Sequence, residues 1–233
     1  MKHVVILSGA GLSAESGIPT FRASDGLWEG HKIEDVATPE AWERNPQLVL
    51  DFYNQRRKRL LEASPNRGHK IIAELESEFR VSVITQNVDD LHERAGSSNV
   101  LHLHGSLLEA RSSKNADLVY PVLGWEMKLG ELCAEGTQLR PNIVWFNEDV
   151  PKIELAVKTT LLADAFVVVG TSLVVYPAAG LVDFVDPSVP LLVVDPNRPK
   201  VFTRANVHFF EEIASSGMER VREKLRQCLR VHG

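Results

Sequence analysis

Near its start the chain reads Val4-Val5-Ile6-Leu7-Ser8-Gly9-Ala10-Gly11-Leu12-Ser13-Ala14, an apolar run that breaks into glycine and small residues. The apolar run has the pattern of a buried strand, and Gly9-x-Gly11-x-x-Ala14 has the spacing of a dinucleotide-binding turn. Gly9 would allow the tight turn, Gly11 would let backbone N–H groups approach a pyrophosphate, and Ala14 would keep the next helix close to the strand. The phosphates would then lie at a positive helix N-terminus. A tight strand-to-helix turn without a ligand has similar spacing, so this motif alone does not establish a function.

The composition is that of a globular protein of 233 residues, long enough for one large domain or one domain with a smaller insert. The net charge of −5 argues against a large nucleic-acid surface. Cys133 and Cys228 are far apart, which excludes a disulfide framework and a four-thiolate zinc site. No apolar run is long enough for a membrane span, and residues 4–7 are too short for a signal peptide. We therefore expect a cytoplasmic protein with reduced thiols and no membrane or nucleic-acid partner.

Three later apolar runs resemble the first: Val81–Ile84, Ala165–Val169 and Leu191–Val194. Each ends in polar or glycine residues, and helical segments separate them. This alternation predicts an α/β fold with a Rossmann-like parallel sheet covered by helices on both faces. Ligands of such sheets bind beyond the carboxyl ends of the strands, where the polar residues would gather.

Two segments, from about Ala23 to Gly68 and from about Leu107 to Gln138, do not follow this alternation. The first is predicted as loop and helices, with a helix starting at Asn45-Pro46, and the second as irregular. We interpret them as insertions that form a smaller module. The predicted division is 1–22, 69–106 and 139–233 for the Rossmann-like domain, and 23–68 and 107–138 for the small module.

Two polar segments are candidates for chemistry. Gln86, Asn87 and Asp89 follow a predicted strand and could bind ribose hydroxyls or a carboxamide, although Asn and Asp also cap helices. His102 and His104 would share one face of an extended segment. No third metal ligand is near them in sequence, so a general base is the simpler hypothesis, with a structural histidine as the alternative.

Two further segments suggest a substrate site. The apolar, aromatic segment from Arg140 to Glu148 could be a core strand or the wall of a groove for an aliphatic side chain or an extended peptide. Tyr53 and Arg56 would share one face of the predicted helix. Arg56 could simply extend to solvent from the apolar stripe, or it could bind a carboxylate together with Tyr53.

Taken together, these segments resemble the sirtuins, the NAD-dependent protein deacylases. The resemblance spans nearly the whole chain, and its motifs come in the family order: Gly9-Ala10-Gly11-Leu12-Ser13-Ala14-Glu15-Ser16-Gly17-Ile18-Pro19-Thr20-Phe21-Arg22, Thr85-Gln86-Asn87-Val88-Asp89, His104-Gly105, Gly170-Thr171-Ser172 and, as in bacterial members, Val175-Tyr176-Pro177-Ala178-Ala179-Gly180.

The resemblance implies roles for individual residues. His104 would be the general base, with Asn87 and Asp89 as its catalytic partners. Val144, Trp145 and Phe146 would line the acyl-lysine tunnel. The residues expected to bind NAD are Gly9, Ala10, Gly11, Ala14, Glu15, Thr20, Phe21, Arg22, Trp28, Gln86, Asn87, Asp89, Gly170, Thr171, Ser172, Asn197 and Ala214.

The resemblance also implies the reaction. NAD would be consumed, and the products would be free lysine, nicotinamide and O-acyl-ADP-ribose. Tyr53 and Arg56 match the Tyr-x-x-Arg pair of the desuccinylase-type sirtuins, which implies succinyl- or malonyl-lysine as substrate, with acetyl-lysine also accepted. The alternatives are a sirtuin-like ADP-ribosyltransferase or NAD glycohydrolase, or, from a different class, a non-catalytic NAD-sensing domain. A nicotinamide dehydrogenase is suggested only by the glycine turn.

The chain departs from the family pattern at two places. Many sirtuins hold a structural zinc with four cysteines in the small module, whereas this region offers only Cys133, so no zinc is expected. Asn147 stands where the family usually has Gly, which puts in doubt how the peptide backbone is held there.

Overall fold

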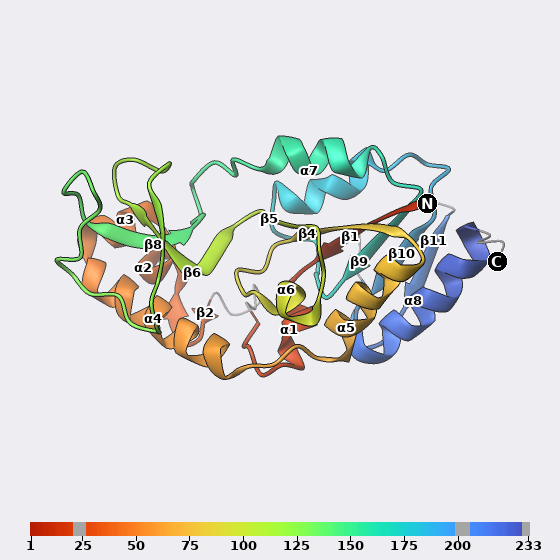
Figure 1. Ribbon diagram of the computed structural model, residues 1–233, viewed down its shortest axis with the longest axis horizontal. Helices are drawn as coiled ribbons and strands as arrows, with labels where there is room; N and C mark the ends of the chain where they lie inside the picture. The colour runs from red at the N-terminus through yellow and green to blue at the C-terminus, as the bar shows by residue number, and fades with distance from the viewer. Residues whose placement is uncertain (21–26, 199–205, 230–233) are drawn as a thin grey trace.

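The computed structural model describes residues 1–20, 27–198 and 206–229, and Figure 1 shows a larger sheet-containing part and a smaller module. The strands of the larger sheet are β1 (His3–Ser8), β4 (Arg80–Thr85), β5 (Val100–His102), β9 (Ala165–Val169), β10 (Leu191–Val194) and β11 (Val207–Phe210). They pair in parallel in the order β11-β10-β9-β1-β4-β5. β1 is buried along its whole length between two parallel neighbours, which explains its continuous apolar run.

Helices cover both faces of this sheet, as the sequence predicts. Val4 and Ile6 of β1 face one core, while Val5 and Leu7 face the other, because side chains alternate along a strand. Figure 1 shows α5 and α8 on one side and α7 on the other. The covering helices are α5 (Arg67–Glu74), η1 (Leu75–Ser77) and α8 (Ala214–Leu229) on the first face, and α7 (Ile153–Thr160) and η2 (Ala178–Phe184) on the second.

The strand register brings the predicted polar segments to one edge. Ser8 lies opposite Thr85 and Val169, and Val169 lies opposite Val194. The segments that follow these strands therefore leave the sheet side by side. Two short helices begin near this edge, α1 (Ala10–Ala14) and α6 (Leu91–Ala95).

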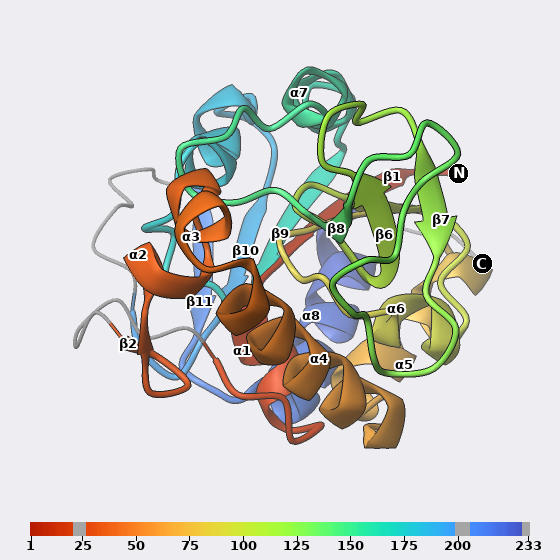
Figure 2. The ribbon, with the colours of Figure 1, turned by 90° about the vertical axis from the view of Figure 1, so that its left-hand side faces the viewer.

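The small module combines helices with an antiparallel sheet, and Figure 2 views the molecule from this side. Asn45 accepts a hydrogen bond from the Leu48 N–H over 3.1 Å and Pro46 follows it, so the predicted helix start is confirmed. The elements are the hairpin β2 (Leu27–Trp28) and β3 (His31–Lys32), the helices α2 (Ile33–Val36), α3 (Pro39–Arg44) and α4 (Pro46–Glu62), and the strands β6 (Gly105–Ser112), β7 (Val119–Pro121) and β8 (Leu139–Ile143).

The antiparallel sheet differs from the sequence expectation. Residues 107–138 are predicted to be irregular, yet they contain most of β6 and all of β7. β8 pairs with β6, so residues 139–143 belong to the smaller sheet, although the predicted division groups them with the larger one. The small sheet is only partly buried and its apolar residues alternate poorly, so its strands carry a weak sequence signal. Within the described residues no helix is both long and apolar enough to cross a membrane.

Candidate functional site

A cavity of about 850 Å³ lies beyond the carboxyl ends of the larger sheet and extends to the small module. This volume is in the range of cofactor and ligand pockets. Phe21 and Arg22 lie outside the described residues. All the other predicted site residues line the cavity: Gly9, Ala10, Gly11, Ala14, Glu15, Thr20, Trp28, Tyr53, Arg56, Gln86, Asn87, Asp89, His104, Val144, Trp145, Phe146, Gly170, Thr171, Ser172, Asn197 and Ala214.

The glycine turn packs against the loop that follows β9. A Cβ atom on Gly9 would lie 2.6 Å from the Thr171 Cβ, and one on Gly11 would lie 2.8 Å from the Gly170 Cα. The Gly11 N–H donates to the Gly170 carbonyl over 2.8 Å. That N–H is therefore used inside the protein, and the glycines are needed for the contact between two loops as well as for access by a ligand.

Buried hydrogen bonds hold the polar residues after β4. The Asn87 amide donates to the Gly9 carbonyl over 3.1 Å and to the Ser13 hydroxyl over 3.0 Å. Ser13 in turn donates to the Asp89 carboxylate over 2.9 Å. Burial raises the pKa of Asp89, although Ser13 and the Leu91 N–H act against this. This network ties Asn87 and Asp89 to the glycine turn.

The helix-capping alternative also has support, because Asp89 accepts a hydrogen bond from the Leu91 N–H at the start of α6. Ser13 was not among the predicted site residues. Its sequence signal is weak, because a small polar residue in a short helix is ordinary, and its partners are far away in the chain.

The two histidines have different surroundings. The Nδ1 atom of His104 lies 3.0 Å from the Gln86 carbonyl, and a carbonyl can only accept, so Nδ1 carries the hydrogen. Nε2 is then the basic nitrogen. Burial lowers the pKa of His104, while the Gln86 carbonyl opposes this shift. A half-buried neutral imidazole at the cavity wall can take a proton from a bound hydroxyl group.

His102 is not one of the cavity-lining residues; it contacts the Glu93 carboxylate over 2.7 Å and the Asn87 carbonyl over 3.1 Å. Burial alone would lower the pKa of His102, but Glu93 and Asn87 outweigh this effect and raise it. The two rings therefore do not converge on a shared metal site. Among the described ranges, no group of three or more His, Cys, Asp or Glu side chains could hold a metal ion.

Tyr53 and Arg56 of α4 line the cavity from the small module. Both are buried, so Arg56 does not extend to solvent. Neither the Tyr53 O–H nor the buried Arg56 Nε donates a hydrogen bond to any described residue. Burial raises the pKa of the Tyr53 phenol, and the nearby Arg56 charge opposes this shift. Burial lowers the pKa of Arg56, and the Glu29 carboxylate opposes that shift. Two buried donors without partners form a site that an anionic group would satisfy.

Comparison with known proteins identifies the family. Residues 9–177 match the model of the Sir2 family. The chain belongs to the Sir2 family. The sirtuin resemblance of its motifs and its α/β fold are thereby confirmed.

Curated Sir2 relatives match over almost their whole length. A protein of Bacteroides thetaiotaomicron named NAD-dependent protein deacylase is 50% identical over 230 residues, which cover 97% of this chain and 98% of the relative. A Helicobacter pylori (strain ATCC 700392 / 26695) protein of the same name is 52% identical over 227 residues, with 97% and 98% coverage. A solved Sir2 homologue–NAD complex is 38% identical, with a TM-score of 0.87 and coverage of 98% of this chain and 91% of that one.

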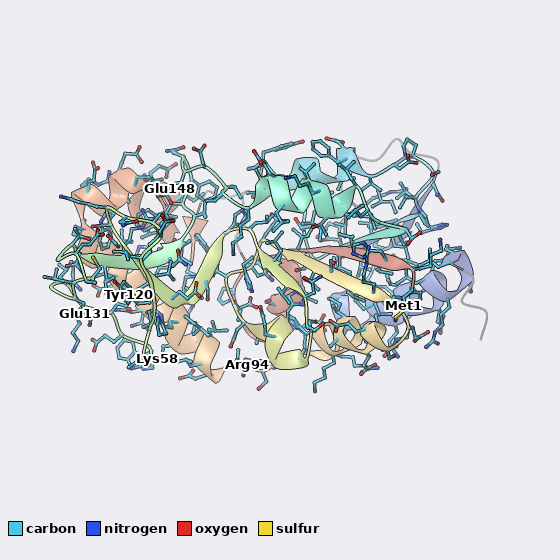
Figure 3. The ribbon with its side chains drawn as sticks, turned by 45° about the horizontal axis from the view of Figure 1, so that its top comes forward. Met1, Lys58, Arg94, Tyr120, Glu131 and Glu148 are labelled. Atoms are coloured by element: carbon cyan, nitrogen blue, oxygen red, sulfur yellow. The ribbon has the colours of Figure 1, made fainter. Side chains whose placement is uncertain are left out.

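For residues 139–148 of this Sir2 chain the sequence left two interpretations, a core strand or the wall of a groove, and each describes part of the segment. Residues 139–143 form a strand, whereas Val144, Trp145 and Phe146 follow it and line the cavity. Glu148 fixes this turn by accepting from the Trp145 N–H over 2.8 Å and pairing with Arg140, and Figure 3 shows its side chain in the small module.

Asn147 has a φ of +70°. This left-handed conformation costs Gly little, and Asn tolerates it better than most other residues. The backbone geometry of the turn therefore accepts Asn in place of the usual Gly.

Several predicted cavity residues also have structural contacts. The Glu15 carboxylate accepts from the N–H and hydroxyl of Ser215 at the start of α8. Gln86 donates to the Thr171 hydroxyl over 3.1 Å, and the Asn197 N–H donates to Asp195 over 2.8 Å. These contacts fix part of the cavity wall.

Glu29, which pairs with Arg56, was not among the predicted site residues either. It lies in the turn between β2 and β3, where an acidic residue carries no particular signal.

Proposed function

We propose that this Sir2-family chain is an NAD-dependent protein deacylase that removes succinyl and malonyl groups, and also acetyl groups, from lysine side chains. The family match and the relatives named NAD-dependent protein deacylase support the deacylase activity. One observation carries the acyl preference: the buried Tyr53 hydroxyl and Arg56 Nε, two donors without acceptors, belong to residues that line the same cavity as the glycine turn. The substrates would be acylated proteins or peptides, and we propose the cytoplasm as the location.

The cavity residues fit NAD. The glycine turn and Gly170, Thr171 and Ser172 would hold the phosphates, and Gln86 would lie near the nicotinamide ribose. Asn197 and Ala214 would lie near the adenine. When bound, NAD supplies the ribose carbon that receives the acyl oxygen as nicotinamide departs. Nothing in this arrangement calls for hydride transfer.

His104 would provide the proton transfer. Its Nδ1 donates to the Gln86 carbonyl, which orients the ring and leaves Nε2 to accept a proton from a ribose hydroxyl. Asn87 and Asp89 would orient that ribose through the network that also holds Ser13. Val144, Trp145 and Phe146 would exclude water around the acyl-lysine side chain.

The direct test is incubation of the protein with NAD and a succinyl-lysine peptide. We expect release of nicotinamide together with O-succinyl-ADP-ribose, identified by mass spectrometry. ADP-ribosylated protein or free ADP-ribose as the main product would support the transferase or glycohydrolase alternative instead. Binding of NAD with no acyl-dependent release of nicotinamide would support a sensing domain.

Arg56→Met is expected to lower kcat/KM for a succinyl peptide by about tenfold or more, the effect of a lost charged hydrogen bond. The loss on the matching acetyl peptide should be much smaller, because a neutral acetyl group makes no ion pair. Steady-state kinetics on both peptides measures the ratio. Arg44→Met, an exposed change on α3, is the control for loss of an arginine. Equal losses on the two peptides would contradict the role of Arg56.

The pH dependence of deacylation should reflect the lowered pKa of His104. The base acts in its neutral form, so the rate falls as acidification protonates it. Because burial shifts the pKa below the usual value of about 6.5, the acidic fall in kcat/KM should be centred below pH 6.5. An acetyl peptide is the suitable substrate, since its acyl group does not titrate. A midpoint above pH 6.5 would disagree with this assignment.

We also propose that the small module is stable without zinc. The Ser112 hydroxyl lies 2.6 Å from the Thr137 hydroxyl, which lies 3.0 Å from the Cys133 Sγ. Ser112 also accepts from the backbone N–H groups of Lys114 and Asn115, so hydrogen bonds close the loop. Elemental analysis should find far less than one zinc per chain, and EDTA should leave the melting temperature unchanged. One stoichiometric zinc would refute the proposal.

A further inference from the structure

Glu29 provides a carboxylate that is already bound to Arg56. It lies in the turn between β2 and β3 with a φ of +52°, and its side chain is 11% exposed. This carboxylate pairs with Arg56 through one oxygen and with Arg59 through the other. Figure 1 shows β2 beside α4, the helix that carries both arginines.

The two arginines differ in their surroundings. The Arg56 side chain is 6% exposed, whereas that of Arg59 is 49% exposed. The Arg56 guanidinium lies 4.3 Å from the centre of the Trp28 ring and 5.7 Å from that of Phe52, so aromatic faces confine it. Arg59 lies at the solvent side of the same carboxylate.

The nitrogen atoms of the Arg56 guanidinium differ in their partners. Nη1 donates to Glu29, whereas the buried Nε has no partner. Arg56 lines the cavity and Glu29 is not among the lining residues. Glu29 therefore contacts the guanidinium without lining the cavity, and Nε is left for a further partner.

We propose that Glu29 sets how strongly this enzyme prefers negatively charged acyl groups, by sharing the Arg56 guanidinium with the substrate carboxylate. This inference rests on the proposed role of Arg56 in binding that carboxylate. Glu29 has two opposing effects on the site. It orients Arg56 and compensates its charge in a buried position, which keeps the guanidinium beside the cavity. It also repels a second carboxylate on the other side of the same guanidinium.

The charges of this cluster would allow both charged and neutral acyl groups. The cluster of Arg56, Arg59 and Glu29 carries two positive charges and one negative charge, and Arg59 offsets part of the Glu29 charge from the more exposed side. A neutral acetyl group then meets a guanidinium that is already paired, so it leaves no bare buried charge. A succinyl group gains an ion pair that is weaker than one with an uncompensated arginine.

Two substitutions should change the preference in opposite directions. Glu29→Gln keeps a side-chain oxygen for Arg56 but removes the repelling charge, so the ratio of kcat/KM for succinyl over acetyl peptide should rise about fivefold, through a lower KM for the succinyl peptide. Arg59→Gln leaves Glu29 to Arg56 alone, so the same ratio should fall about twofold to threefold. Activity on the acetyl peptide should stay within about twofold in Arg59→Gln, whereas Glu29→Gln should lower it, because a neutral acetyl group then leaves the buried Arg56 charge without a partner.

Two control variants remove a charge of the same sign from exposed positions on α4. Glu62→Gln matches the first variant, and Lys58→Gln, at the residue labelled in Figure 3, matches the second, since both side chains are exposed. A general structural defect would lower activity on both peptides without raising the ratio. An unchanged or lower ratio in Glu29→Gln would overturn the inference. If Glu29→Gln does not fold, an unchanged or higher ratio in Arg59→Gln overturns it.

Arg56→Met, measured in the same series, distinguishes a failure of the Arg56 carboxylate site from a failure of the role of Glu29. Equal losses on both peptides in that variant would remove the basis for an acyl-carboxylate site. Selective loss in Arg56→Met without the opposite shifts in the Glu29 and Arg59 variants would leave the site in place and refute only the role of Glu29.

Discussion

His104→Ala should lower kcat for deacylation by about 100- to 10,000-fold, the usual contribution of a general base. The loss should be similar for succinyl and acetyl peptides, because proton transfer from the ribose hydroxyl does not depend on the acyl group. Removal of the imidazole takes away Nε2 and also the Nδ1 hydrogen bond to the Gln86 carbonyl. Nicotinamide release under saturating NAD and peptide measures the effect.

His104→Asn separates the two functions of the ring. Its side-chain amide can replace the hydrogen bond to Gln86, but it cannot accept a proton in the way that imidazole does. The Asn variant should therefore keep the melting temperature and the affinity for NAD while losing deacylation as severely as the Ala variant. More than about a tenth of the original kcat in either variant would argue against His104 as the base.

Gly170→Ala should have the largest effect on the fold of the nucleotide site. Gly170 has a φ of +63°, and a Cβ there would lie 2.2 Å from the Leu12 nitrogen and 2.6 Å from the Gly11 carbonyl carbon. Because these contacts are with backbone, side-chain rotation cannot relieve them. We expect a loss of about 3 kcal/mol or more in the free energy of unfolding, together with loss of NAD binding. Urea unfolding and calorimetric titration with NAD would measure both.

Two other glycines serve as controls for this variant. Gly130 has a φ of +93° but no atom within 4 Å of its Cβ position, so Gly130→Ala isolates the conformational cost, about 1–2 kcal/mol. The Gly180 Cβ position meets only the Tyr176 ring, at 3.6 Å, so Gly180→Ala should change stability little. If Gly170→Ala were no more destabilising than Gly130→Ala, the close approach of the two loops would not matter energetically.

The parts of the fold that the sequence predicts well depend on local signals. The run from Val4 to Leu7 is apolar because both of its faces are buried, and Asn45-Pro46 starts a helix through its own side chain and ring. The strand ends gather the predicted cavity residues because parallel strands share one carboxyl edge. These features need little knowledge of distant partners.

The features that the sequence does not predict depend on distant partners. Residues 139–143 pair with β6, whose own apolar pattern is broken by Glu109 and Arg111. Arg56 meets Glu29 from 27 positions away, and Ser13 meets Asp89 from 76 positions away. A single sequence gives no sign of such pairs, because each residue alone is ordinary for a helix or a turn.

The position of His104 between the two sheets has a mechanical consequence. The Leu103 N–H donates to the Thr85 carbonyl of the larger sheet over 2.9 Å, while the Val144 N–H donates to the His104 carbonyl over 2.9 Å, and Gly105 pairs with Ile143. His104 thus lies at the connection between the two sheets. A rotation of the small module about this connection would displace the distant rim of the cavity much more than the imidazole, so the width of the opening would change while the position of the ring is kept.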